Sequence, residues 1–155
     1  MDYLVVKWLH ILSSTLLFGT GLGSAWYMLF ANVSRDVRAI AVVGKYVVIA
    51  DWLFTATTAV IQPATGAYMI HLAGYPWTSH WIAWSVALYV LAGVCWLPVV
   101  WIQIRLRDIA AQTVRDGGTA LPPLYWTYFR TWVALGIPAF IAFVFIFWFM
   151  VSKPT

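Results

Sequence analysis

Charged residues and cysteine are scarce in this chain, and glutamate is absent. Only 9% of the 155 residues are charged, where a soluble domain has about a quarter, so an ordinary soluble domain is excluded. The acids are five aspartates, so hydrolytic chemistry that depends on paired carboxylates lacks its parts. The single cysteine, Cys95, excludes a disulfide within the chain, and we expect it to be a small buried helix residue.

Apolar side chains make up 63% of the sequence, and they are concentrated in long uncharged runs at residues 8–34, 52–104 and 131–152. About 20 apolar residues cross a bilayer, so the first and last runs give one span each and the middle run holds two. The segment 71–80 (HLAGYPWTSH) divides the middle run, because it carries the Gly, Pro and Ser of a turn. We therefore predict an all-α fold, a four-helix transmembrane bundle forming one domain over residues 1–155. The predicted spans are about 4–31, 47–71, 81–104 and 130–151.

Seven of the nine Lys and Arg residues lie in or beside two of the three connections: Arg35, Arg38 and Lys45, then Arg105, Arg107, Arg115 and Arg130. Only Lys7 and Lys153 lie on the other side. The positive-inside rule then places both termini and the 71–80 loop on the outer, periplasmic side of a bacterial inner (plasma) membrane. The connection 105–129 is expected to be cytoplasmic, with its first part continuing the third helix as far as Asp116-Gly-Gly. The net charge of +4 follows from this topology and does not indicate nucleic-acid binding.

Polar and small residues in membrane helices face one another, because lipid offers polar groups no partner. Steps of three and four residues define one inward stripe in each of the first three spans. The stripes are Lys7, His10, Ser14, Leu17, Gly21, Ser24 and Met28; Asp51, Thr55, Thr58, Gln62, Thr65 and Met69; and Ser85, Leu88, Ala92, Cys95, Val99 and Ile102. Five of the six residues in the second stripe are polar, so this face is the most firmly predicted to turn inward.

His10 is the strongest candidate for a functional residue. All three histidines are predicted on one side of the membrane, and His10 alone lies inside a span, about 9 Å below its outer end. Ionisable residues at such positions are rare and usually functional, and imidazole can ligate haem iron or another metal. Gln62 and Thr65 are predicted at a similar depth and would line the same pocket. Lys7, one turn above, would reach a haem propionate or simply extend its amine to the interface.

His71 is the preferred candidate for the second axial ligand, although it lies two residues past Met69 and so points away from the stripe. A bend at Pro63 and Gly66 would turn it inward. His80 or Met69 could take its place, or the iron could have a single protein ligand.

Asp51 is predicted to pair with Lys45, Arg105 or Arg130 at the inner end of the bundle. A proton relay through Asp51 and the threonines of its stripe is the alternative. Gln62 and Thr65 also have two possible roles, because they could donate to a ligand or satisfy carbonyls freed by Pro63. The small residues at 19–23 (GTGLG) favour close helix contacts within or between chains, including a homo-oligomer or another membrane-protein partner.

Four blocks of the sequence are similar to an uncharacterised bacterial family of predicted integral membrane proteins, a domain of unknown function: 6–11 (VKWLHI), 62–66 (QPATG), 95–108 (CWLPVVWIQIRLRD) and 136–140 (GIPAF). This resemblance covers nearly the whole chain and implies a four-helix membrane protein. More distantly, the chain resembles HemJ-type protoporphyrinogen oxidases and CopD-type copper-resistance membrane domains, which carry a histidine early in their first helix. The HemJ resemblance implies haem b bound through His10. It does not extend to the lysine of the third HemJ helix, since residues 81–104 contain none.

The sequence therefore predicts a membrane protein that binds haem b through His10 and His71, with Lys7, Gln62 and Thr65 around the cofactor. It would transfer electrons or oxidise a small lipophilic partner such as a quinol or a porphyrin. One alternative is a periplasm-facing copper-handling protein that uses His10, Met69, His71 and His80, since methionine favours Cu(I). The other is a non-catalytic accessory or assembly subunit whose polar stripes only pack helices. No dinucleotide loop, phosphate loop, zinc pair or serine triad is present.

Overall fold

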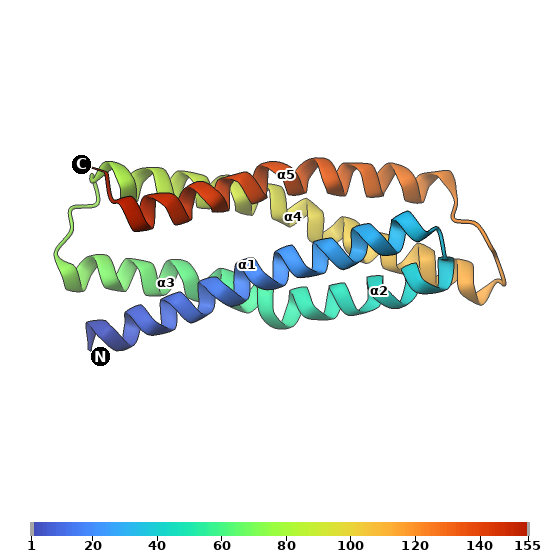
Figure 1. Cartoon of the computed structure of the whole chain (residues 1–155), viewed down its shortest axis with the longest axis horizontal. Helices are drawn as coiled ribbons and strands as arrows, with labels where there is room; N and C mark the ends of the chain where they lie inside the picture. Colours follow the sequence, from blue (N-terminus) through green and yellow to red (C-terminus); the bar gives the residue numbers. More distant parts are fainter. Residues whose placement is uncertain (1, 155) are drawn as a thin grey trace.

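Four long helices run side by side along the molecule (Figure 1), in a computed structural model that describes residues 2–154. The elements are α1 (Tyr3–Ser34), α2 (Val37–Ala50), the π-helical turn η1 (Asp51–Thr55), α3 (Ala56–Ala73), α4 (His80–Arg115) and α5 (Pro123–Ser152). Because α2, η1 and α3 follow one another without a break, they form one continuous helix, Val37–Ala73. All four resulting helices are long and apolar enough to cross a membrane. The predicted all-helical class and number of spans are confirmed.

The ends of the helices follow local sequence signals rather than the limits of the apolar runs. Asp36 caps α2, because its side chain accepts from the backbone N–H groups of Arg38 and Ala39 at 2.9 and 3.3 Å. The second span therefore begins ten residues before the predicted residue 47. At the other connection α4 runs on to Arg115, and Gly117 follows with a φ of +70°, as the Asp116-Gly-Gly segment predicted. Only residues 116–122 of the expected loop 105–129 lie outside helices.

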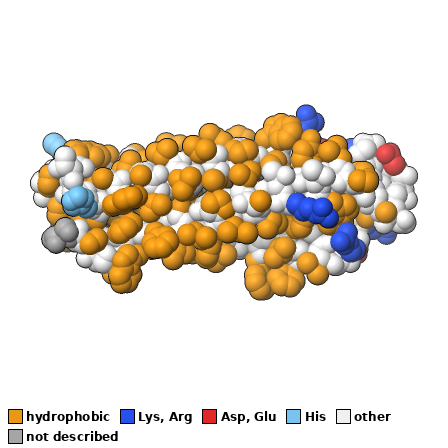
Figure 2. Space-filling model, turned by 90° about the horizontal axis from the view of Figure 1, so that it is seen from above, with side chains coloured by type: hydrophobic (Ala, Val, Ile, Leu, Met, Phe, Trp, Pro, Cys, Tyr) orange, Lys and Arg blue, Asp and Glu red, His pale blue; other side chains and the backbone are white. Residues whose placement is uncertain are grey.

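Both ends of the described chain lie at one end of the bundle, together with the α3–α4 connection (Figure 1). We call this the terminal end. The opposite, basic end carries the α1–α2 turn and the α4–α5 connection, and Figure 2 shows Lys and Arg side chains gathered toward it and histidines at the terminal end. The even number of crossings thus agrees with the predicted placement of both termini on one side. The assignment of that side as the outer one stays a prediction.

The hydrophobic core of the bundle lies in its basic half. It consists of Met28, Ile40, Val47, Val99, Ile102, Leu106, Ala110, Tyr125 and Trp132. The terminal half buries much less, since Thr58 is the only buried residue of α3 and Ala142 is the only one of α5 between residues 133 and 152. There α1 meets α5 through aromatic contacts of Phe18 with Phe140 and Phe147, at centroid distances of 5.6 and 5.3 Å. The terminal half therefore buries fewer side chains, and aromatic rings form its contact between α1 and α5.

The predicted inward stripes are confirmed for the second and third spans. No member of the second stripe is exposed, and Asp51, Thr55 and Thr58 are buried. The first stripe is only partly correct, because Lys7 is exposed and Ser13 is buried instead of Ser14. The prediction of close contacts at residues 19–23 is not realised within the chain, since a Cβ added to any of its three glycines would meet no atom of another element within 4 Å.

Candidate functional site

The imidazole of His10 on α1 lies against α3, in the terminal half. Its Nδ1 is 2.8 Å from the hydroxyl oxygen of Thr65, and its Nε2 is 3.4 Å from the side-chain nitrogen of Gln62. The hydroxyl of Ser13, one turn further along α1, donates to the side-chain oxygen of Gln62. These four side chains form a polar cluster between two helices whose other contacts are mostly apolar. We refer to it as the His10 cluster.

The hydrogen-bond partners favour one tautomer of the His10 ring. The hydroxyl of Thr65 is 2.8 Å from the backbone carbonyl of Ile61 on its own helix, to which it can donate its one hydrogen. With that hydrogen on the carbonyl, Thr65 accepts from His10, and this arrangement assigns the proton of a neutral ring to Nδ1. Nε2 in this tautomer keeps its lone pair and faces the Gln62 amide at 3.4 Å.

The α3 backbone passes close to the ring of His10 at Gly66. A Cβ added to Gly66 would lie 3.4 Å from Cε1 of His10, which is van der Waals contact distance. The edge of the imidazole therefore lies against the backbone of α3 at this residue.

Pro63 lies within the same turns of α3 and removes one backbone donor. The carbonyl it would leave free is that of Ala59, four residues earlier. Tyr89 on α4 donates its hydroxyl to this carbonyl at 2.6 Å. Two roles were predicted for Gln62 and Thr65. Tyr89 already satisfies the Ala59 carbonyl, so that role is not theirs. Their polar side chains contact His10 instead.

The other predicted ligands lie elsewhere. His71 is exposed in the last turn of α3, six residues beyond Thr65, which corresponds to about 9 Å along the helix axis. His80 is exposed at the start of α4, and Lys7 is exposed one turn above His10. Within residues 2–154, no three histidine, cysteine or acidic side chains come together as a metal site. The structure thus brings His10 together with Gln62 and Thr65, as the depth argument predicted, and not with His71.

The family model described as "Predicted integral membrane protein (DUF2269)" matches residues 4–154, almost the entire sequence. The chain belongs to this family. No curated protein and no solved structure matches it. The distant likeness to HemJ-type oxidases and CopD-type domains is therefore not shown by these comparisons. Family membership and four spanning helices together make this DUF2269 protein a multi-pass membrane protein in contact with the lipid bilayer.

A second polar cluster of this DUF2269 protein lies around Asp51, in the first position of η1. Asp51 is buried and does not form the predicted ion pair, since the one ion pair among the described residues joins Arg107 and Asp108. Arg105 instead lies over the ring of Trp101 at 5.2 Å, and Lys45 lies 5.9 Å from that of Tyr46. Aromatic faces near the membrane interface attract these cations away from the interior. The predicted ion pair of Asp51 is therefore wrong.

Sequence reasoning missed two residues of these DUF2269 clusters. Ser13 was passed over for Ser14, which follows the ideal spacing from His10 but is only half-buried. Gln103 on α4 is buried and directed at Asp51, although it was left out of the third stripe. The signal for Gln103 was present, because an uncharged amide four residues after Val99 continues the inward face.

Proposed function

We propose that this DUF2269 protein binds haem b in the terminal half of its bundle, with His10 as the protein ligand. The proposed activity is electron transfer, or the oxidation of a small lipophilic partner such as a quinol or a porphyrin. The observation that carries the proposal is the imidazole of His10 inside a membrane-spanning helix, with Nδ1 at 2.8 Å from the Thr65 hydroxyl oxygen and Nε2 at 3.4 Å from the Gln62 amide. Metal-ligating histidines almost always donate their other N–H to a fixed partner, a role that Thr65 would fill for His10.

The residues fit one protein ligand to a haem iron and do not fit two. His71 is about 9 Å from the level of Thr65 and is exposed, so the geometry offers no second imidazole to the same iron. The aromatic side chains around Phe18, two turns from His10, provide an apolar wall, and the terminal half buries few side chains of its own. Lys7 lies nearer the terminal end than His10 and would pair with a carboxylate of the cofactor. Haem held by His10 would supply one-electron redox chemistry.

A second candidate is an accessory subunit in which the His10 cluster only joins α1 to α3. The observation in its favour is that both ring nitrogens of His10 already have partners on α3. Hydrogen bonds of this kind between membrane helices are worth about 0.6 kcal/mol on average. Copper binding has no comparable support, because no three histidine, cysteine or acidic side chains come together among the described residues, and both His71 and His80 are exposed.

Absorbance of the detergent-purified protein tests the proposal directly. Protein produced with ample haem is expected to show a Soret band when oxidised and a shifted band after reduction with dithionite. Absence of the band would overturn haem binding. Metal analysis of the same sample would then separate a copper protein from one that binds no metal.

Thr65→Val is expected to weaken haem binding on the order of tenfold or more, because it removes the group that orients His10 while keeping the shape of the side chain. The measurement is haem retained per protein during titration with a competing haem-binding protein. Thr57→Val is the matched control, since Thr57 is exposed on the same helical span and donates only to the carbonyls of Leu53 and Phe54. Equal haem retention in both variants would contradict a role for Thr65 in orienting the ligand.

A further inference from the structure

A buried carboxyl group without a cation partner lies in the second span, far from the His10 cluster. Asp51 is 5% exposed. It precedes Gln62 by eleven residues, which is about 16 Å along the helix. A charged group in a membrane interior is costly and is usually paired or functional. Asp51 therefore needs an explanation of its own.

The helices packed against η1 bring no charge to this carboxyl. On α1 the titratable side chains on either side of the part that packs against η1 are His10 and the exposed Tyr27. On α2 the nearest titratable groups are the exposed Tyr46 and Lys45, whose amine lies 5.9 Å from the Tyr46 ring, and on α3 the buried polar side chain is that of the neutral Thr58. The groups on α4 are Arg105, Arg107 and Cys95. Arg105 lies over Trp101, Arg107 pairs with Asp108, and Cys95 is about 12 Å along the helix from Gln103.

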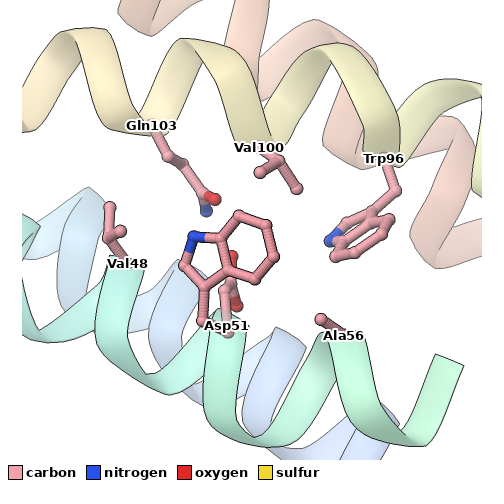
Figure 3. A pocket seen from close by; sticks show the side chains of 7 residues that line it. Val48, Asp51, Ala56, Trp96, Val100 and Gln103 are labelled. Carbon is pink, nitrogen blue, oxygen red and sulfur yellow. The ribbon is translucent and has the colours of Figure 1, made fainter.

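Two uncharged side chains face Asp51 instead. The hydroxyl of Thr55 donates to a carboxyl oxygen at 3.0 Å, and Gln103 reaches it from α4 (Figure 3). A glutamine side chain has both a donor and an acceptor. Gln103 can therefore donate to an ionised carboxylate and, by turning its amide, accept from a protonated one. The surroundings suit Asp51 in either state.

A cavity adjoins the carboxyl on the side of Gln103. It measures about 10 Å³, the space of about one water molecule, and it is lined by Val48, Asp51, Trp52, Ala56, Trp96, Val100 and Gln103 (Figure 3). Asp51 and Gln103 would supply the polar partners that a buried water requires. Trp52 is 60% exposed, so one wall of the cavity is a side chain at the surface of the bundle.

The backbone is irregular at the same point. Residues 51–55 form a π-helical turn, in which the N–H of Ala56 bonds the carbonyl of Asp51, five residues earlier. Such turns inside longer helices occur frequently at functional sites. The buried carboxyl, the amide, the cavity and the π-turn therefore coincide in one place.

We propose that Asp51, Gln103 and Thr55, with one water in the adjoining cavity, form a proton-binding site inside the helical bundle. The carboxylate takes one proton from a hydronium ion to give the carboxylic acid and water, and the reverse step releases it. No electron moves. The site is independent of haem binding, so it stands or fails separately from the proposed function.

Labelling with the lipophilic reagent dicyclohexylcarbodiimide tests the proposal on the full-length protein in proteoliposomes. This reagent adds to protonated carboxyls in apolar surroundings, and peptide mass spectrometry assigns the adduct. We expect an adduct on Asp51 whose rate falls about tenfold per pH unit above its midpoint. Replacing choline with sodium as the buffer cation is expected to leave the rate of labelling at Asp51 unchanged. No adduct at any pH between about 5 and 9, or protection by sodium, would overturn the assignment, the latter in favour of a metal-cation site.

Variants separate this role from a structural one. Asp51→Asn should abolish the adduct, while Asp108→Asn should leave it intact, because Asp108 is an exposed partner of Arg107. Gln103→Leu should change the pH at which labelling falls, and Gln112→Leu, an exposed amide on the same helix, should not. The wild-type adduct decides the question even where Asp51→Asn fails to fold. An unchanged pH profile in Gln103→Leu would overturn the part assigned to Gln103.

Discussion

Replacing His10 with alanine is expected to reduce the haem content of the purified protein at least about tenfold, the effect of losing a ligand or its support. Among residues 2–154, His10 carries the one imidazole that is not exposed. Its Nδ1 lies 2.8 Å from the hydroxyl oxygen of Thr65, which orients the ring. No neighbouring side chain of the cluster can replace it, since Ser13, Gln62 and Thr65 are weak ligands for haem iron. The Soret absorbance per protein gives the result directly.

His71→Ala and His80→Ala are the matched controls for this experiment. Both histidines are exposed at the terminal end, and the same substitution at either is expected to leave the Soret band in place. Full haem content in His10→Ala, or loss in His71→Ala alone, would show that the ligand has been wrongly assigned. A wild-type protein without haem whose stability falls on His10→Ala would instead support the accessory-subunit alternative.

Leu106→Ala is expected to destabilise the protein by about 2–3 kcal/mol, the lower part of the range for buried leucine. Leu106 is 1% exposed and belongs to the core of the basic half, together with Met28 and Tyr125. The lower part of the range is appropriate because lipid surrounds much of the molecule. The cost then comes mainly from lost van der Waals packing and less from transfer of the side chain between water and the protein interior. Reversible unfolding in mixed detergent micelles measures the change.

Leu97→Ala is the control for this prediction. It makes the same change on the same helix, but Leu97 is 66% exposed on the outside of the bundle. Its effect is expected to stay below about 0.5 kcal/mol, as for substitutions away from packed sites. Equal effects of the two substitutions would show that the basic-half core does not hold the bundle together.

Much of the fold could be predicted because lipid restricts what a helix can expose. The run of Asp51, Thr55, Thr58, Gln62, Thr65 and Met69 had to face inward, and it does. Glycine after Asp116 correctly marked the end of α4. The start of α2 was placed too late, because apolar content defines where a helix can cross a membrane and not where Asp36 begins it. The π-turn had no signal, since five ordinary helix residues adopt it only through packing.

The part of the candidate site that depends only on the depth of each residue along its helix could be predicted from the sequence. Counting residues from the ends of two antiparallel helices placed His10 beside Gln62 and Thr65. Rotation about each helix was harder to predict, because a small turn exchanges neighbouring residues such as Ser13 and Ser14. Partner choice was hardest, since it depends on competing contacts: Arg105 lies on an aromatic ring and leaves Asp51 to Gln103.

The bond from Tyr89 to the carbonyl of Ala59 also bears on how the chain is assembled in the membrane. A nascent chain that has inserted only α1 and the Val37–Ala73 helix carries one carbonyl that Pro63 cannot serve and that lipid cannot satisfy. Both helices of that half are then fully formed, but the Ala59 carbonyl has no hydrogen-bond donor until α4 is inserted. The first helical hairpin therefore depends on the second, which supplies the partner for its free backbone carbonyl.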